Sequence, residues 1–288
     1  MVYLLLSIFF TTAVFLTIKE FNRFKIDNLI GIVVSYFTAL LIGNFYSGTQ
    51  ISYSYLLDKT WVWGAICISI FFIIVFNLMA VTAQKGGLSV MSVANKMSVV
   101  IPISMGVVLY NEALGVTKAL GIVMALLGVW FTSKKTGVDQ FDKRYWYLPF
   151  FIFIGSGIAD SILNHMQTLY VPQKELAVFS TSLFLFCGLI GVVVCLIKYL
   201  LGSLQFSLKS VIGGLVLGVP NYFSIYFFLK ALSQGTYATS LVFSLNNLLV
   251  VLLSVFLGVV LYKEKLSQQN YLGIGMSVVA IVLLYFAL

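Results

Sequence analysis

The sequence predicts an all-α, polytopic membrane protein built from two related halves, and three observations lead to this fold class. Hydrophobic residues make up 61% of the chain and charged residues 9%, whereas roughly a quarter of the residues in a soluble domain are charged. The hydrophobic residues fall into runs of about 20, the length of a membrane-spanning helix. Finally, the segment Gly106–Glu112 returns 152 positions later as Gly258–Glu264 with one substitution.

These runs are predicted to be helices and not strands of a barrel. In lipid, every backbone polar group needs a partner within the protein, which leaves helices and closed barrels as spanning structures. Barrel strands alternate apolar and polar residues over about ten positions. Residues 245–261 instead contain successive apolar residues without that alternation, so helices are favoured.

Ten hydrophobic runs are predicted to cross the membrane, five in each half. In order, they lie near residues 2–18, 28–47, 61–83, 88–110, 117–133, 146–169, 175–199, 208–231, 236–261 and 268–288. The first run is retained as a span because it lacks the basic start and the cleavage pattern of a signal peptide. Since five crossings bring the chain to the opposite side, the second half begins inverted. The sequence thus predicts one five-helix repeat over 1–133, a polar linker over 134–145, and an inverted five-helix repeat over 146–288.

Lysine and arginine are distributed unequally between the two sides of this arrangement. The connections after the odd-numbered spans carry twelve of them and the other connections carry four. Because cytoplasmic connections are enriched in these residues, the charge distribution predicts that both termini lie outside the cytoplasm.

Composition also argues against several classes of protein. The net charge of +8 is explained by the connections, and no soluble basic domain is present, so we expect no nucleic-acid partner. The cysteines Cys67, Cys187 and Cys195 lie in predicted spans and indicate neither a disulfide framework nor a metal site. The chain contains no P-loop, no dinucleotide fingerprint and no zinc motif. We therefore expect no cofactor, no metal and no ATP hydrolysis.

Two repeated segments connect the chain with a known family. Gly106–Gly128 and Gly258–Val279 each contain an apolar helix, a short turn with Glu, and a Leu-Gly-Ile that opens the next helix. Similar turns, Ala83–Gly86 and Lys230–Gly235, precede them. With these segments the whole chain resembles the EamA-type transporters of the drug/metabolite transporter superfamily.

This resemblance implies ten helices arranged as two fives. It also implies a carrier of small polar metabolites, often amino acids, nucleobases or sugars, that works by alternating access. Members of the superfamily are usually drawn with both termini in the cytoplasm, opposite to the charge distribution, and both orientations stay open.

Function is expected where charge is buried, because a charged side chain at the centre of a spanning helix costs about 2.5 to 3.5 kcal/mol on insertion scales. Of the 26 charged residues, Lys96 and Asp160 lie deep in predicted spans. They are expected either to form a structural ion pair between the halves or to line a site that takes substrate or a proton. Lys96 corresponds to Leu248 in the second repeat, as an asymmetric substrate would require.

Further polar residues are expected beside these charges. Asn95 has a counterpart in Asn247, and such amides either bridge helices or contact substrate. A cluster of glycines with Pro220 is predicted to open a helix backbone to a cavity, and a nearby tyrosine would provide either a stacking surface or packing. The candidate substrate-binding residues are therefore Lys96, Asn95, Asp160, Asn164, Asn221, Tyr222, Asn246 and Asn247.

Three further titratable residues are given other roles. His165, the one histidine of the sequence, lies near a predicted helix end, where it is either solvated or couples transport to protons. Glu112 and Glu264 lie in the turns of the repeated segments, where a carboxylate is expected to complement a helix dipole; beside Lys263 and Lys265, Glu264 is expected to be solvated.

The sequence therefore predicts a multi-pass secondary transporter of the cell membrane, inner or plasma, that moves a small polar solute past Lys96 by alternating access. Its partners would be the lipid bilayer, a small and amino acid-like or anionic solute, and protons. The alternative is a carrier or flippase for a lipid-linked substrate. An intramembrane enzyme using Asp160 and His165 lacks a second buried carboxylate and a nucleophile motif, so no catalytic residue is expected. A scaffold would leave Lys96 unexplained, and the substrate, direction, coupling and oligomeric state are left open.

Overall fold

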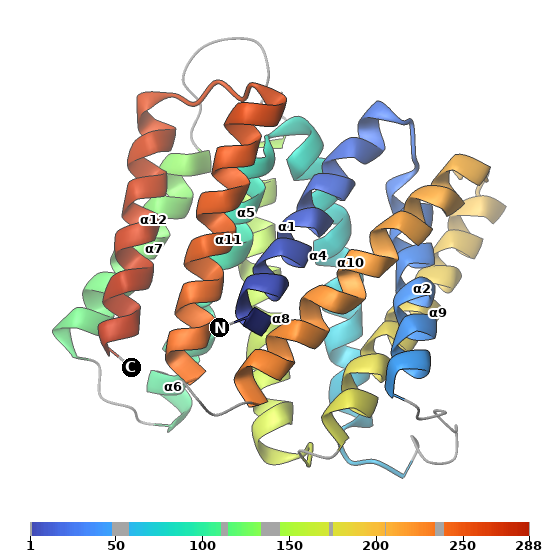
Figure 1. The fold of residues 1–288 in the computed structure, drawn as a ribbon, viewed down its shortest axis with the longest axis horizontal. Helices are drawn as coiled ribbons and strands as arrows, with labels where there is room; N and C mark the ends of the chain where they lie inside the picture. The colour runs from blue at the N-terminus through green and yellow to red at the C-terminus, as the bar shows by residue number, and fades with distance from the viewer. Residues whose placement is uncertain are drawn as a thin grey trace.

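A computed structural model describes residues 2–47, 58–110, 115–133, 145–172, 175–204, 206–233 and 239–287, and these form a bundle of helices that run up and down past one another (Figure 1). The helices are α1 (Val2–Arg23), α2 (Asn28–Ser47), α4 (Val62–Lys85), α5 (Leu88–Met97), α6 (Val100–Tyr110), α7 (Val116–Ser133), α8 (Leu148–Leu169), α9 (Leu176–Leu200), α10 (Leu208–Ser233), α11 (Thr239–Tyr262) and α12 (Gln268–Ala287).

Nine spans among the described residues are long and apolar enough to cross a membrane, with α5 and the start of α6 counted as one span. The remaining helix, α7, has a shorter apolar stretch, Val116–Thr132. The predicted all-helical, multi-pass membrane fold is thus confirmed. Most of the predicted linker, residues 134–144, and Glu112 lie outside the described residues.

The predicted span over 88–110 is broken in two. Helix α5 ends at Met97, and α6 begins at Val100. The cause lies four residues after Ser98, at Pro102, whose ring removes a hydrogen-bond donor and clashes with the carbonyl group of residue i−4 in a regular helix. The Ser98 hydroxyl donates a hydrogen bond to the Asn95 carbonyl oxygen. A backbone acceptor near the break is therefore satisfied within the protein, as a membrane interior requires.

The predicted opening of the helix around Pro220 is wrong, because α10 is helical throughout from Leu208 to Ser233. Its glycines serve close packing instead. A Cβ atom at Gly214 would meet Val34 and the Gly31 carbonyl oxygen, and one at Gly218 would meet Thr38. These glycines bring α10 against α2, as small residues do between membrane helices.

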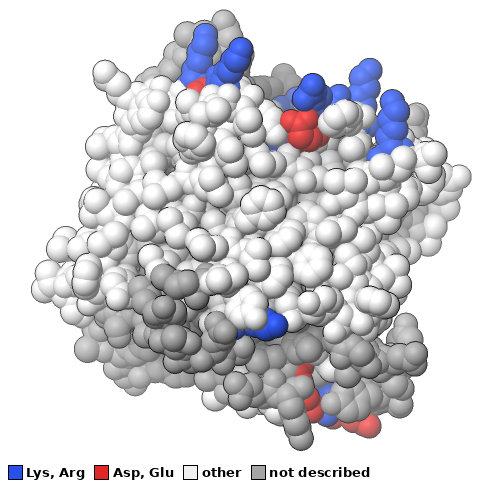
Figure 2. All heavy atoms as spheres, in the orientation of Figure 1, with Lys and Arg blue, Asp and Glu red and all other residues white. Residues whose placement is uncertain are grey.

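The two ends of the bundle differ in charge. We call the end where α1 finishes and α2 begins the basic end. It carries most of the described lysine and arginine residues, by the bounds of the helices: Lys19, Arg23, Lys25, Lys85, Lys198, Lys209, Lys263 and Lys265. Figure 2 shows lysine and arginine side chains gathered along the top of the molecule. The opposite end carries Lys59, Lys118 and Lys230. This asymmetry is what the positive-inside rule describes.

Candidate binding cavity

A cavity of about 520 Å³ lies in the middle of the bundle. It is bounded by residues of α1, α2, α4, α5, α6, α8, α9, α10, α11 and α12. Its volume falls within the range of small-molecule sites, roughly 300 to 1,000 Å³. Aromatic side chains form much of its wall: Phe15, Tyr36, Phe72, Phe76, Phe184 and Phe228.

The cavity extends to the end opposite the basic end. On α8 its lining reaches Gln167, two residues before the helix ends, and on α9 it reaches Ser180 near the helix start. Toward the basic end it stops at Met79 of α4 and Asn95 of α5, six and seven residues inside those helices. At 1.5 Å per residue, roughly 9 Å of protein separates the cavity from the basic end.

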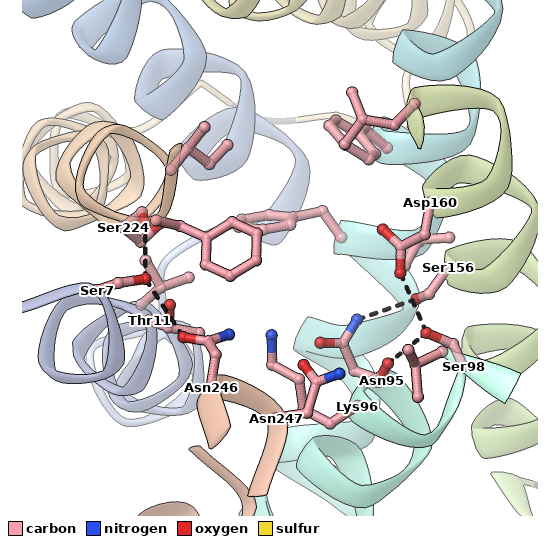
Figure 3. Close-up of a pocket in the computed structure, with 18 of the residues that line it drawn as sticks. Ser7, Thr11, Asn95, Lys96, Ser98, Ser156, Asp160, Ser224, Asn246 and Asn247 are labelled. Atoms are coloured by element: carbon pink, nitrogen blue, oxygen red, sulfur yellow. Dashed lines mark hydrogen bonds between the residues drawn. The ribbon is translucent and has the colours of Figure 1, made fainter. Parts of the chain in front are cut away.

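Lys96 and Asp160 both line this cavity but form no ion pair with each other, since no nitrogen–oxygen distance between them lies within 4.0 Å. The Lys96 side chain extends between Asn246 and Asn95 (Figure 3). Asp160 projects from α8, and its carboxylate lies 3.3 Å from the Ser98 hydroxyl oxygen, whose single proton goes to the closer Asn95 carbonyl oxygen. Of the two arrangements considered from the sequence, the direct structural ion pair is absent, and the two charges are left facing one space.

Hydrogen bonds hold some of the amide side chains. Asn95 donates to the Ser156 hydroxyl oxygen at 3.0 Å and thereby joins α5 to α8. The Ser7 hydroxyl donates to the Ser224 carbonyl oxygen at 3.0 Å and lies 3.4 Å from the Asn246 carbonyl oxygen, Oδ1, which joins α1, α10 and α11.

Asn221 is different from these amides. It is 5% exposed and lines the cavity, yet its side-chain nitrogen has no hydrogen-bond partner in the part of the chain that the structure describes. Buried amide nitrogens are normally satisfied, so an unsatisfied one in a native protein calls for a physical explanation. A polar group in the cavity would satisfy it.

The remaining predicted site residues divide into two groups. Asn164 and Asn247 line the cavity, Asn164 at the end where the cavity is accessible. Tyr222 is not among the lining residues. It is buried between α10 and α2, with its ring stacked on Tyr226 at 5.8 Å between centroids and with an edge against the position where Gly43 of α2 would carry a side chain.

His165 also lies outside the lining of the cavity, with its ring 5.9 Å from that of Tyr170. The structure thus brings seven of the eight predicted site residues to one space and leaves the tyrosine and the histidine out of it.

Sequence reasoning missed a set of small hydroxyl residues that line the cavity: Ser7, Thr11, Ser98, Ser156, Ser180 and Ser224. The pattern carries little signal, because serine and threonine in apolar helices usually bond to their own backbone. Thr12, for example, donates to the Ile8 carbonyl oxygen. Pro102, four residues after Ser98, is the one sequence feature that indicates a break in the helix at Ser98.

Metal binding has no support among the residues that the structure describes, where no three His, Cys, Asp or Glu side chains gather. The polar groups in the cavity wall are amides, hydroxyls, one ammonium group and one carboxylate group. Such a set can hold a polar organic molecule by hydrogen bonds and by charge.

Comparisons with known proteins support the fold. No protein-family model matches the chain. A protein of Haemophilus influenzae that is described as uncharacterized is 29% identical over 214 residues, which cover 74% of this chain and 71% of that protein. A solved crystal structure, whose description states no function, is similar with a TM-score of 0.61 at 15% identity, covering 98% of this chain and 94% of the other. Likeness at that identity shows the fold alone. The nine apolar spans make the chain a multi-pass helical membrane protein, and its central cavity has an aromatic wall that carries a few polar and charged groups.

Proposed function

We propose that this protein is a secondary transporter that moves a small polar solute through its central cavity by alternating access. The observation that carries the proposal is the placement of two charged side chains, Lys96 and Asp160, in one cavity at the middle of spanning helices without pairing. Charged residues inside a membrane are costly and mark substrate or ion pathways. A cavity that reaches one end and stops short of the other is the expected form of one state of such a transporter.

The contacts between helices support two inverted repeats. If α1–α7 is the first repeat and α8–α12 the second, then α1 corresponds to α8, α4 to α10 and α7 to α12. Exchanging the repeats turns the α1–α10 contact into an α8–α4 contact, and both are present. In the α7–α12 and α2–α9 contacts, each helix packs against its own counterpart in the other repeat. The exchange leaves these contacts unchanged, and both are also present. Transporters built from inverted repeats bind substrate where the repeats meet, and the cavity lies between these helices.

The repeated Gly106–Glu112 and Gly258–Glu264 segments support membership of the EamA-type branch of the drug/metabolite transporter superfamily. Such membership would place the protein in the cell membrane, inner or plasma. Movement of the substrate down its own gradient, or against it when coupled to the gradient of another solute or of protons, needs no ATP-binding element in this chain.

The substrate is proposed to carry an anionic group. Lys96 offers an ammonium group without a carboxylate within 4.0 Å among the described residues, and an anion in the cavity would pair with it. A donor group on the same molecule would face Asp160, while an apolar portion would contact the aromatic wall. A molecule with a carboxylate and an amine, amino acid-like in size, combines these features.

The test is thermal stability of the purified protein in detergent with amino acids, nucleosides, sugars and organic acids, for the parent, Lys96→Ala and Lys198→Ala. Lys198 is exposed at the basic end, so it controls for loss of a charge outside the cavity. A bound ligand stabilises by about 2.7 kcal/mol at a hundred times its dissociation constant. We expect a stabilising compound whose effect is lost in Lys96→Ala and kept in Lys198→Ala.

The compound identified in this way must then enter liposomes that contain the protein. Binding without uptake would contradict a transporter. Equal stabilisation of the parent and Lys96→Ala would contradict the anionic contact. Stabilisation by isoprenoid-phosphate lipids alone would favour the alternative, a carrier or flippase for a lipid-linked substrate.

A further inference from the structure

Glu264 lies just after α11, yet its carboxylate group binds the start of α5, in the other half of the chain. One carboxylate oxygen accepts the Leu88 backbone N–H at 2.6 Å. The other accepts the Ser89 backbone N–H at 3.3 Å and the Ser89 hydroxyl at 2.8 Å. The first N–H groups of a helix have no partner within the helix, and a carboxylate there also complements the helix dipole. The expectation of a solvated Glu264 beside its lysine neighbours is therefore wrong, because its side chain is 11% exposed and is shared with another helix.

The same carboxylate group pairs with a third helix. Lys19 of α1 forms an ion pair with Glu264, and both side chains are largely buried, at 13% and 11% exposure. The Lys19 ammonium also lies 4.3 Å from the ring centroid of Tyr262, the last residue of α11. One side chain thus joins α1, α5 and α11 by charge-assisted bonds, which are the stronger kind.

The backbone around Glu264 is shaped for this contact. Gly87 precedes α5 with a φ of 102°, a conformation that other residues rarely adopt. A Cβ atom at Gly87 would lie 3.2 Å from the Glu264 carboxylate. A Cβ atom at Gly258 would lie 2.6 Å from a carboxylate oxygen and 3.0 Å from the Ser89 hydroxyl. Two glycines therefore allow the close approach of α11 to α5.

The contact lies at the basic end, where the cavity stops. On α5, Leu88 and Ser89 hold Glu264, Ser92 lies one turn further along, and Asn95 begins the lining of the cavity. Residues three and four apart share a helix face, so these residues form one continuous edge from the Glu264 contact to the cavity. Ser92 is completely buried, which shows that this edge is closed.

We propose that Glu264 is a latch that holds the basic end of the cavity closed by tying α5 to α1 and α11. Building on the proposed transport function, the latch must release α5 when the cavity opens to the basic end. The contact joins residues from both halves of the chain, so rocking of one half against the other would separate its partners. Neutralising Glu264 weakens every bond of the latch at once, while the residues of the cavity stay unchanged.

The test is the rate of reaction of a single cysteine with a hydrophilic maleimide in detergent-solubilised protein, where both ends are accessible. The three native cysteines are replaced by alanine, and Ser92→Cys reports on the closed edge. A second reporter, Leu163→Cys, lies in the wall of the cavity. With Glu264→Gln we expect Ser92→Cys to react at least about tenfold faster, because bonds to a charged group shift an opening equilibrium by that factor or more. Leu163→Cys should react at a similar rate in both backgrounds.

The matched control is Asp27→Asn, which neutralises a carboxylate at the same end whose side chain caps α2 by accepting the Ile30 backbone N–H at 3.0 Å. It should leave the Ser92→Cys rate unchanged. An unchanged Ser92→Cys rate in folded Glu264→Gln protein would overturn the latch. If Glu264→Gln does not fold, Lys19→Gln decides, because it removes one latch bond and should raise the rate by a smaller factor; no rise would overturn the proposal.

This measurement requires no substrate. A faster Ser92→Cys reaction in a protein that transports nothing would leave the latch in place and remove the proposed function. If the protein transports a solute but Ser92→Cys reacts at the same rate with and without Glu264→Gln, the latch is contradicted and the proposed function stands.

Discussion

The Ser98 hydroxyl at the end of α5 donates to the Asn95 carbonyl oxygen and lies 3.3 Å from the Asp160 carboxylate on α8. This contact exists because the helix stops at Ser98, where Pro102 prevents a regular turn four residues earlier. The break directs a hydroxyl group toward the one described carboxylate in the cavity wall. The break between α5 and α6 therefore forms part of the wall of the candidate binding site.

Ser98→Ala should weaken ligand binding more than it weakens the fold. The substitution removes a polar group beside the Asp160 carboxylate, worth roughly 0.5 to 1.5 kcal/mol, and leaves Asp160 free to turn. We expect a loss of up to about tenfold in apparent affinity for the stabilising compound, read from thermal shifts at several concentrations. Ser92→Ala, which loses a bond to the Ser89 carbonyl oxygen, is the control and should bind normally. Equal loss in both variants would contradict a specific role for Ser98.

Pro102→Ala should make the protein more stable and less able to bind. Pro102 lies in the first turn of α6, where proline is tolerated, so the gain should stay below the roughly 3 kcal/mol of a helix interior. A continuous helix would withdraw the Ser98 hydroxyl from Asp160. Thermal unfolding and ligand shifts, measured on one preparation, separate the two effects. A variant with a raised Tm and a normal ligand response would show that the break has no part in binding.

Lys96→Met should leave the unfolding temperature unchanged or raise it. Lys96 is a charge inside the bundle with no carboxylate within 4.0 Å among the described residues, and replacing buried charge by an apolar side chain of similar length is often neutral or stabilising. The measurement is Tm without ligand. A drop of several degrees would show instead that Lys96 supports the fold.

The packing of α7 on α12 should depend on one glycine and not on its neighbour. A Cβ atom at Gly273 would meet the Thr132 hydroxyl and backbone and the Gly128 carbonyl oxygen, whereas one at Gly275 would meet nothing within 4 Å. Gly273→Ala should destabilise by about 1 to 3 kcal/mol through overpacking. Gly275→Ala should stabilise by up to about 1 kcal/mol through helix propensity. Tm values of the two variants that move in the same direction would contradict the described packing.

Much of the fold followed from composition and period. The apolar runs predict helices near their observed positions, because each run is long enough to span a membrane. Backbone polar groups in lipid must also form hydrogen bonds within the protein. The break between α5 and α6 was only partly predictable, because a proline in a helix either kinks it or ends it, and neighbouring groups decide which. The glycines of α10 were misjudged for a similar reason. Glycine both loosens a helix and lets another helix approach, and only the position of α2 shows that Gly214 and Gly218 do the second.

The candidate site shows the same division. Lys96 and Asp160 could be identified from the sequence alone, because a charged residue within an apolar run is easily recognised there. The free-energy cost of burying that charge in a membrane span does not depend on how the helices pack. Tyr222 and the lining serines could not be sorted, since the direction of a side chain around its helix depends on which neighbours pack there.

The sequence determined that this protein is a set of membrane-spanning helices. The free energy of transferring apolar side chains into lipid and the hydrogen bonding of the backbone are both local properties of each segment. The tertiary structure decided which helices meet, and with that three matters that no local pattern contains. It placed Lys96 and Asp160 in one cavity without an ion pair, left the Asn221 side-chain nitrogen without a hydrogen-bond partner among the described residues, and set Glu264 on the start of α5. Each of these depends on distances between residues far apart in the chain, which are fixed only when the helices pack.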